Sequence, residues 1–279
     1  MTRPSFRAHA ALLMGCLLFT VPLLAHDFWI ASSQWNAKPG GKVSITANVG
    51  DDTYPRSENA TAPERIESLR LFGPTSQESV RAFQVRGQSL VADVTLPQAP
   101  GTYMAVMTVK GRFLKMQAKE FAAYLGEEGL KDVIAERARR KEDGVASRER
   151  YSRQAKTLMR AGDGPSDHVT RPVGIIAELV PDTDLTRARV GDTVAVRLIF
   201  EGKPVAGAQV SAYASGAGKA TTRRQVGHTD SDGRVRFTLK GAGPYLLTTT
   251  HMVRRTGESG PEAVDWESYW VSITFDAMK

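Results

Sequence analysis

Short segments in which apolar residues alternate with polar ones, or follow one another without a break, recur along much of the first half of the chain. The clearest segments are residues 43–49, 90–96 and 104–109, and the turn residues Pro39-Gly40-Gly41 and Pro100-Gly101 separate them. Short segments of either kind, with glycine and proline at the boundaries, are typical of β-strands. Residues 26–122 are therefore predicted to form an N-terminal β-sandwich, with a long polar loop over residues 51–63.

The spacing of apolar residues changes to a helical period between residues 124 and 162. The positions on the two helical stripes are Leu130, Val133, Ile134 and Arg137, then Tyr151, Ala155, Leu158 and Met159. Gly162 follows the second stripe, and glycine commonly ends a helix. Residues 123–172 are therefore predicted to be a helical connector with two helices.

Strand-like segments return after residue 173. They cover residues 190–200, 209–213, 233–239, 245–247 and 266–275, and turn residues separate them. About seven short strands in roughly 100 residues are typical of an immunoglobulin-like sandwich. The segments 202–204, 229–233 and 243–245 also resemble a transthyretin-type sandwich. The chain is therefore predicted to be mainly β, with two immunoglobulin-like or transthyretin-like sandwich domains, the second over residues 173–279, joined by the helical segment.

The first 25 residues contain the three parts of a secretory signal peptide. Arg3 and Arg7 precede an apolar run over residues 10–19, and small Ala25 suits the position before a cleavage site. We expect export to the periplasm, cleavage after Ala25 and no stable transmembrane segment afterwards. A lipoprotein anchored at Cys16 and an uncleaved anchor are the alternatives, although the apolar run is shorter than the ~20 residues of a membrane span.

This cleavage changes what the composition allows. The chain has 279 residues, a formal net charge of +7 and one cysteine, Cys16. Removal of 25 residues, with two arginines and no acidic residue, leaves 254 residues with a net charge of +5 and no cysteine. Thiolate catalysis, cysteine-based zinc sites and disulfides are then excluded, so that any metal must be bound by nitrogen and oxygen ligands.

The basic charge is concentrated in the predicted helical segment. Residues 131–160 contain ten basic and five acidic side chains. A basic helical face would suit an anionic lipid surface or an acidic partner, and it is also common on a solvated helix. Nucleic acid is not expected as a partner, because no recognised nucleic-acid motif is present.

His26 becomes the first residue of the mature chain if cleavage follows Ala25. An N-terminal histidine presents its α-amine and its ring Nδ1 to the same ion, and the amine has an ordinary pKa of about 7.7 to 8.0. A metal therefore displaces its proton at neutral pH. Nitrogen ligation favours a divalent transition metal such as nickel, cobalt, copper or zinc.

Two nitrogen donors require further ligands, and His251 is the first choice. On a predicted strand it shares a face with Tyr245, Leu247 and Thr249, because side chains alternate with a period of two. The segment 266–275 is the expected hairpin partner, which would bring Glu267 or Asp265 near His251. The carboxylates of the first domain that could also contribute are Asp27, Asp51 and Asp52.

Other chemistry receives little support from the residues. His168 and His228 lie in a polar loop and before a turn, and are expected to be ordinary. The acidic segment 230–233 lacks the remaining ligands of a calcium loop, so we expect a tight turn there. The stretch 266–270 is read as packing of a terminal strand, with sugar stacking as the alternative. No hydrolase elbow, phosphate loop, dinucleotide fingerprint or zinc-protease motif is present.

Several motifs together resemble one family. They are Ala25-His26-Asp27-Phe28-Trp29-Ile30, residues 149–156, Gly202-Lys203-Pro204, residues 229–233, His251-Met252 and residues 265–270. Their order is similar to that of a domain-of-unknown-function family described as periplasmic components of nickel or cobalt uptake. The resemblance implies a metal-associated periplasmic protein with His26 as a ligand and His251 in the family's His-Met segment.

The resulting hypothesis is a periplasmic binding protein and not an enzyme. It would capture nickel or cobalt, or else copper or zinc, through His26 with His251, Asp27 and Glu267 as further ligands, and pass the ion to a membrane metal-uptake transporter. One alternative is a copper oxidase of the histidine-brace type. The other is an exported protein-interaction module in which the histidines have no metal role.

Overall fold

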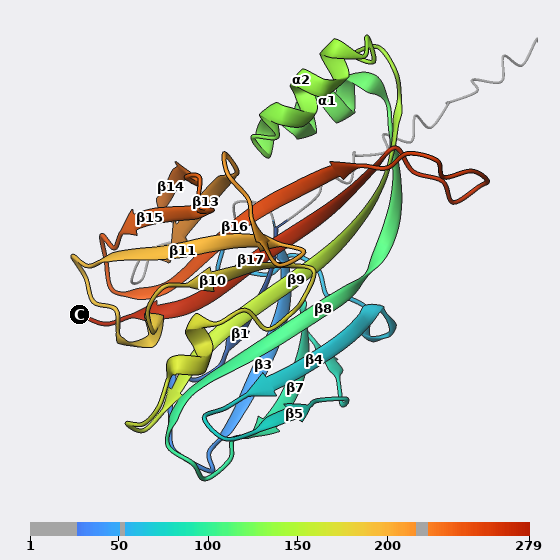
Figure 1. Cartoon of the computed structure of the whole chain (residues 1–279). Coiled ribbons are helices and arrows are strands. Elements are labelled where there is room, and N and C mark those ends of the chain that lie inside the picture. Colours follow the sequence, from blue (N-terminus) through green and yellow to red (C-terminus); the bar gives the residue numbers. More distant parts are fainter. Residues whose placement is uncertain (1–26, 51–53, 216–222) are drawn as a thin grey trace, which may run out of the picture.

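The computed structural model describes residues 27–50, 54–215 and 223–279, and these residues are mainly β (Figure 1). A long central sheet runs through both halves of the chain, and β2 (Asn36–Ala37) pairs with one of its strands. The order of the other strands is β14 (Arg223–His228), β13 (Gln209–Ala214), β16 (Gly243–Arg254), β17 (Trp266–Ala277), β9 (Ser147–Ala161), β8 (Gly101–Met116), β4 (Ile66–Phe72) and β5 (Gln77–Ser79). The parallel pairing of β17 with β9 joins the two halves.

Two smaller sheets cover opposite faces of the central sheet. The first contains β1 (Asp27–Ser32), β3 (Lys42–Gly50), β7 (Ser89–Thr95) and β6 (Gln84–Arg86). The second contains β10 (Ala177–Pro181), β11 (Thr193–Phe200), β12 (Lys203–Pro204) and β15 (Arg234–Thr238). In Figure 1 the second sheet lies in front of the long strands and the first lies behind them.

Strand β8 explains why both layers form. Tyr103, Ala105 and Met107 point into the core under the first small sheet. The alternate residues Met104 and Val106 point into the core under the second. A strand that is buried on both faces needs apolar residues at consecutive positions, and residues 103–107 provide them. The strand predictions over residues 43–49, 90–96 and 104–109 are confirmed.

Two helices cover the end of the central sheet that the first small sheet leaves open. They are α1 (Ala118–Glu127), which begins with a capping box between Gln117 and Glu120, and α2 (Lys131–Arg139). Gly129 adopts a φ of 68° in the turn between them, where a residue with a Cβ would be strained. Phe121 and Tyr124 pack against Trp266 and Trp270 of β17. The short 3₁₀ helices are η1 (Pro63–Arg65), η2 (Asp167–Thr170) and η3 (Leu185–Arg187).

The second predicted helix is wrong, because residues 147–161 form strand β9. Tyr151, Ala155 and Met159 face the helices and the first small sheet, whereas Leu158 faces the second. Apolar residues on both faces of a doubly buried strand fall three or four positions apart as readily as two, and so imitate a helical period. The predicted basic helical face is also divided, since only part of it lies on α2.

The sandwich-like packing predicted for both halves is present, with one sheet common to both. The helices project from the long strands and do not lie as a connector between two separate sandwiches (Figure 1). The predicted hairpin of β16 with β17 is confirmed, and so is the tight turn at Asp230, whose carbonyl accepts the Gly233 amide at 2.9 Å. Among the described residues, no helix has the length and apolar character needed to cross a membrane.

Candidate functional site

The predicted ligand His26 lies outside the described residues, as do Asp51 and Asp52. Asp27, to which His26 is covalently bonded, is the first residue of β1 and pairs with Gly50. The hydroxyl of Thr248 on β16 donates a hydrogen bond to Asp27 Oδ1 at 3.1 Å. The start of β1 is therefore held against the central sheet.

Glu128, which comes from the end of helix α1, also lies close to Asp27. It follows the last residue of α1, and the hydroxyl of Thr250 donates to its Oε2 at 2.7 Å. Burial raises the pKa of Glu128 to about 8, and the negative charge of Asp27 acts in the same direction. Thr248 and Thr250 are two residues apart on one strand and share a face. The two carboxylates are therefore neighbours on one face of the sheet.

Two further polar side chains lie beside these threonines. Ser272 is opposite Thr248 and Trp270 is opposite Thr250 in the pairing of β16 with β17. They are 1% and 3% exposed, and neither Ser272 Oγ nor Trp270 Nε1 has a hydrogen-bond partner in the described part of the chain. Buried polar groups are normally hydrogen-bonded, so this face contains donors that need acceptors.

His251 lies on the opposite face of the same strand. The prediction that it shares a face with Tyr245 and Leu247 is confirmed, because these residues enter the core under the second small sheet. The His251 ring centre is 4.6 Å from that of Phe200, and the side chain borders a small cavity of about 80 Å³. Burial lowers the pKa of His251, and the charge of Asp132 opposes this change. The structure does not bring His251 and Asp27 together.

The carboxylates expected near His251 have other partners. Arg150 Nε donates to Glu267 at 3.0 Å, and Arg255 also pairs with it. Although burial alone would raise the pKa of Glu267, these two arginines lower it. Asp265 accepts from the Arg148 backbone and side chain. Both carboxylates are thus engaged in ion pairs and are not free to approach His251.

The remaining histidines form no cluster. His168 lies in η2, where burial lowers its pKa, and His228 is exposed at the end of β14. Across the described ranges 27–50, 54–215 and 223–279, no three or more His, Cys, Asp or Glu side chains are grouped so that they would hold a metal ion. Asp27 and Glu128 alone supply only part of a coordination sphere.

Sequence reasoning missed Glu128 and also a group of arginines around Tyr151, formed by Arg65, Arg112 and Arg153. The threonine pair was open to inference, because a period of two places Thr248 and Thr250 on the face opposite His251. Glu128 and the arginines come from separate elements, and no local pattern indicates that they meet.

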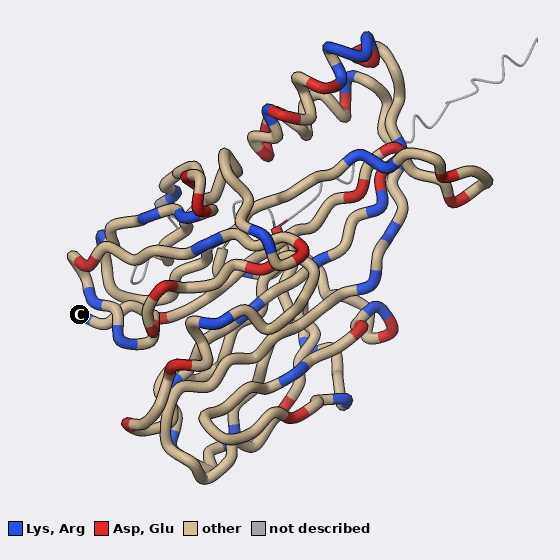
Figure 2. The backbone as a smooth tube through the Cα atoms, in the orientation of Figure 1, with Lys and Arg blue, Asp and Glu red and all other residues tan. Residues whose placement is uncertain are grey.

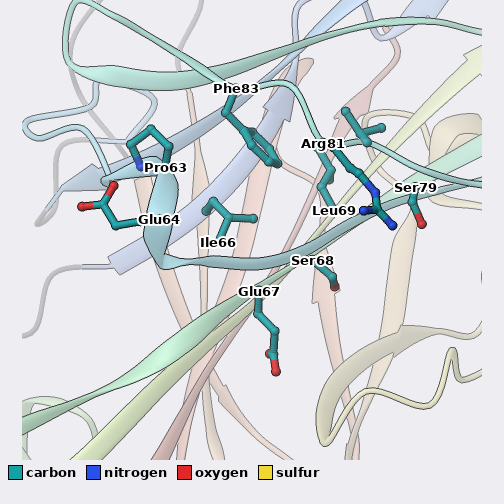
Figure 3. Close-up of a pocket in the computed structure, with 10 residues that line it drawn as sticks. Pro63, Glu64, Ile66, Glu67, Ser68, Leu69, Ser79, Arg81 and Phe83 are labelled. Atoms are coloured by element: carbon teal, nitrogen blue, oxygen red, sulfur yellow. The ribbon is translucent and has the colours of Figure 1, made fainter.

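A larger groove than the one beside His251 lies elsewhere, along β4 and the segment that follows β5. It has a volume of about 610 Å³ and is bordered by both apolar and charged side chains. Figure 3 shows Phe83 extending toward Ile66, whereas Glu67 points away from the groove. None of the site residues predicted from the sequence borders it, so the groove is separate from the start of β1.

Comparison with solved structures gives only distant similarity. The chain is similar to Salmonella α2-macroglobulin reacted with methylamine, at 12% identity and a TM-score of 0.25, covering 91% of this chain and 15% of that chain. The Escherichia coli adhesin FdeC is 17% identical with a TM-score of 0.25, and the match covers 88% of this chain and 64% of that chain. The Yersinia pseudotuberculosis adhesin InvE is 12% identical with a TM-score of 0.23, and the match covers 88% of this chain and 58% of that chain. The chain thus spans less than two thirds of the length of each of these structures.

No curated protein matches the chain. The model of one family, described as "Domain of unknown function (DUF4198)", matches residues 23–253, which is most of the chain. The chain belongs to this DUF4198 family.

Proposed function

We propose that this protein is a periplasmic binding protein for a divalent transition metal, with nickel or cobalt favoured and copper or zinc as further possibilities. The metal is cargo, held first by the α-amine and imidazole of His26 after cleavage behind Ala25, and then passed to a membrane uptake transporter. The observation that carries the proposal is the pair of carboxylates, Asp27 and Glu128, beside the position where His26 joins the chain.

The donor set supports this role chemically. Burial and the nearby charge of Asp27 both favour the neutral form of Glu128, and a bound divalent cation would favour its charged form. Two nitrogens from His26 with carboxylate oxygens form a mixed set that suits nickel, cobalt, copper and zinc. Ser272 and Trp270 would then serve as hydrogen-bond donors to metal-bound carboxylate or water.

The proposal assigns the site to one face of the central sheet. His251 and Glu267 lie on the other face and are not ligands in it. The lack of a second histidine on the described part of the Asp27 face also gives no support to a copper histidine brace. The role that best fits the available donors is binding and transfer of the ion.

The test is calorimetric titration of the mature chain that begins at His26 with Ni²⁺, Co²⁺, Cu²⁺ and Zn²⁺. We expect one ion to bind with a Kd of about micromolar or tighter. In a matched chain with one alanine before His26, the imidazole is kept but the free α-amine belongs to the alanine. We expect this chain to bind the ion at least about tenfold more weakly. The isosteric variant Glu128→Gln should also bind more weakly, because it removes a charged oxygen donor.

Binding weaker than about micromolar for all four ions would contradict the proposal, as would equal affinity of the mature and extended chains. The intact mass of the exported protein is the necessary companion measurement, because the amine of His26 exists only if cleavage follows Ala25.

A further inference from the structure

One side of strand β8 has no partner strand where β8 runs beyond the start of β4. Strand β4 pairs with β8 only as far as Val109, which is opposite Ile66. On its other side, β8 continues to pair with β9 from Arg112 to Met116. In the described part of the chain, no strand pairs with the remaining side of this segment, and Figure 1 shows this part of β8 at the margin of the sheet. The central sheet therefore has a free edge here.

This free edge, defined as residues 112–116 of β8, offers backbone groups for pairing. In an antiparallel ladder, every second residue directs its N–H and C=O away from the strand with which it is paired. Arg112, Phe113 and Lys115 are exposed, so solvent reaches this part of the strand. A row of unpaired backbone groups at the edge of a sheet is a template on which a further strand can form.

The two faces of the free edge carry different side chains. Leu114 and Met116 are partly buried and pack against the apolar cluster beneath the helices. Arg112 shares their face, because side chains alternate with a period of two. Phe113 and Lys115 lie on the other face, where Phe113 is 45% exposed. A strand added at this edge would therefore meet a cation on each face, with apolar side chains between the two cations.

The chain along the free edge is basic. Residues 110–119 include four cations, Lys110, Arg112, Lys115 and Lys119, and no acidic residue. Within the ranges that the structure describes, no carboxylate lies at ion-pair distance from Arg112 or Lys115. Figure 2 shows basic positions along β8 where the strand runs toward the helices. The charge of the edge is therefore complementary to a strand that carries carboxylates.

We propose that the free edge binds an extended acidic segment of a partner protein, which adds to the central sheet as a further strand. The positions opposite Arg112 and Lys115 are three residues apart, so the matching segment has two carboxylates separated by two apolar residues. These apolar residues would lie opposite Phe113 and Leu114. A second copy of this chain does not match, because its own edge is equally basic and like charges on paired strands repel. The inference does not depend on His26 or on metal binding.

The test is a titration of the full mature chain into a fluorescently labelled, end-blocked peptide, Ser-Thr-Glu-Val-Val-Glu-Thr-Ser, followed by fluorescence anisotropy at low ionic strength. The peptide reads the same in both directions, so parallel and antiparallel pairing bring the same residues to the edge. We expect one peptide to bind per chain with a Kd below about 100 μM. The double variant Arg112→Glu with Lys115→Glu should bind at least about tenfold more weakly. Arg139→Glu with Lys240→Glu, at two exposed positions elsewhere, changes the net charge equally and should bind as the parent does.

A second peptide separates strand pairing from charge attraction. N-methylation of both valines keeps the two carboxylates but removes two neighbouring N–H donors, one of which faces the free edge in either direction of pairing. We expect no binding of this peptide up to about 1 mM, because backbone hydrogen bonds supply the affinity when a strand is added to a sheet.

The proposal would be overturned if the unmodified peptide showed no saturable binding up to about 1 mM. Equal binding of the N-methylated peptide, or an equal loss in the two double variants, would also overturn it, because net charge would then explain the result. Dimerisation of the parent chain in sedimentation, lost in Arg112→Glu with Lys115→Glu, would assign the edge to a second copy instead. Binding to phosphatidylglycerol vesicles in place of the peptide, with the same loss, would assign it to an anionic lipid surface.

Discussion

Strand β9 carries two buried cations, one on each face, and their surroundings differ. Lys156 points toward the second small sheet, where its Nζ lies 2.6 Å from Glu178 and 3.0 Å from the Leu179 carbonyl oxygen. Glu178 also accepts from the Val173 and Gly174 amides. Arg153, on the other face, has Arg65 and Arg112 as neighbours and lies beside Tyr151.

The two cations differ in whether the protein itself supplies all of their partners. The Lys156–Glu178 pair is 1% exposed on both sides, and its hydrogen bonds all come from the protein, so nothing further is needed to hold it. Around Tyr151 three arginines meet, Glu128 lies beside Asp27, and the buried donors of Ser272 and Trp270 have no acceptor in the described residues. The first arrangement completes a core, whereas the second is one that a bound ligand would stabilise under the proposed function.

The largest expected effect on stability comes from breaking the buried Lys156–Glu178 pair. Lys156→Met leaves the Glu178 carboxylate buried without its cation, and we expect the free energy of unfolding to fall by about 3–5 kcal/mol. Urea denaturation of the purified variant measures this change. The double variant Lys156→Met with Glu178→Gln keeps an acceptor for the Val173 and Gly174 amides and should recover most of the loss. A double variant as unstable as the single one would show that packing, and not charge, dominates here.

A smaller effect is expected from Glu149, which lies beneath the helices and accepts from the hydroxyl groups of Tyr124 and Ser268. Burial raises the pKa of Glu149 to about 7. The folded state therefore favours the protonated acid, so its contribution to stability is complete below pH ~4.5 and is lost as the pH rises through about 7. The loss is on the order of 3 kcal/mol by pH 8.

Urea unfolding between pH 4.5 and 8 tests this dependence. The stability of Glu149→Gln relative to the parent should rise with pH, because glutamine does not ionise. Glu67→Gln, at an exposed position of β4, should instead give a curve parallel to that of the parent. Parallel curves for both variants would mean that the pKa of Glu149 is not raised in the folded state.

The sequence predicted the strands better than it predicted their partners. Residues 43–47 alternate because one face is more deeply buried than the other, and residues 90–92 are apolar throughout because all three are buried. Both patterns are local signals. Strand β9 was mistaken for a helix because it is buried on both faces, a consequence of layers built from distant segments. His251 was placed on the correct face of its strand. Asp27 and Thr248 are 221 positions apart in the sequence. A periodic pattern within one strand does not predict a contact between residues so far apart.

The smallest expected effect is also the sharpest test of which face holds the metal. His251→Gln removes an imidazole that contacts Phe200 on the face opposite Asp27, so we expect the metal affinity of the mature chain to change by less than about twofold, within the range of noise in a measured Kd. Glu128→Gln, on the other face, should weaken binding clearly. If His251→Gln instead weakens binding and Glu128→Gln does not, the site lies under the second small sheet, and the carboxylate pair at the start of β1 is only a feature of folding.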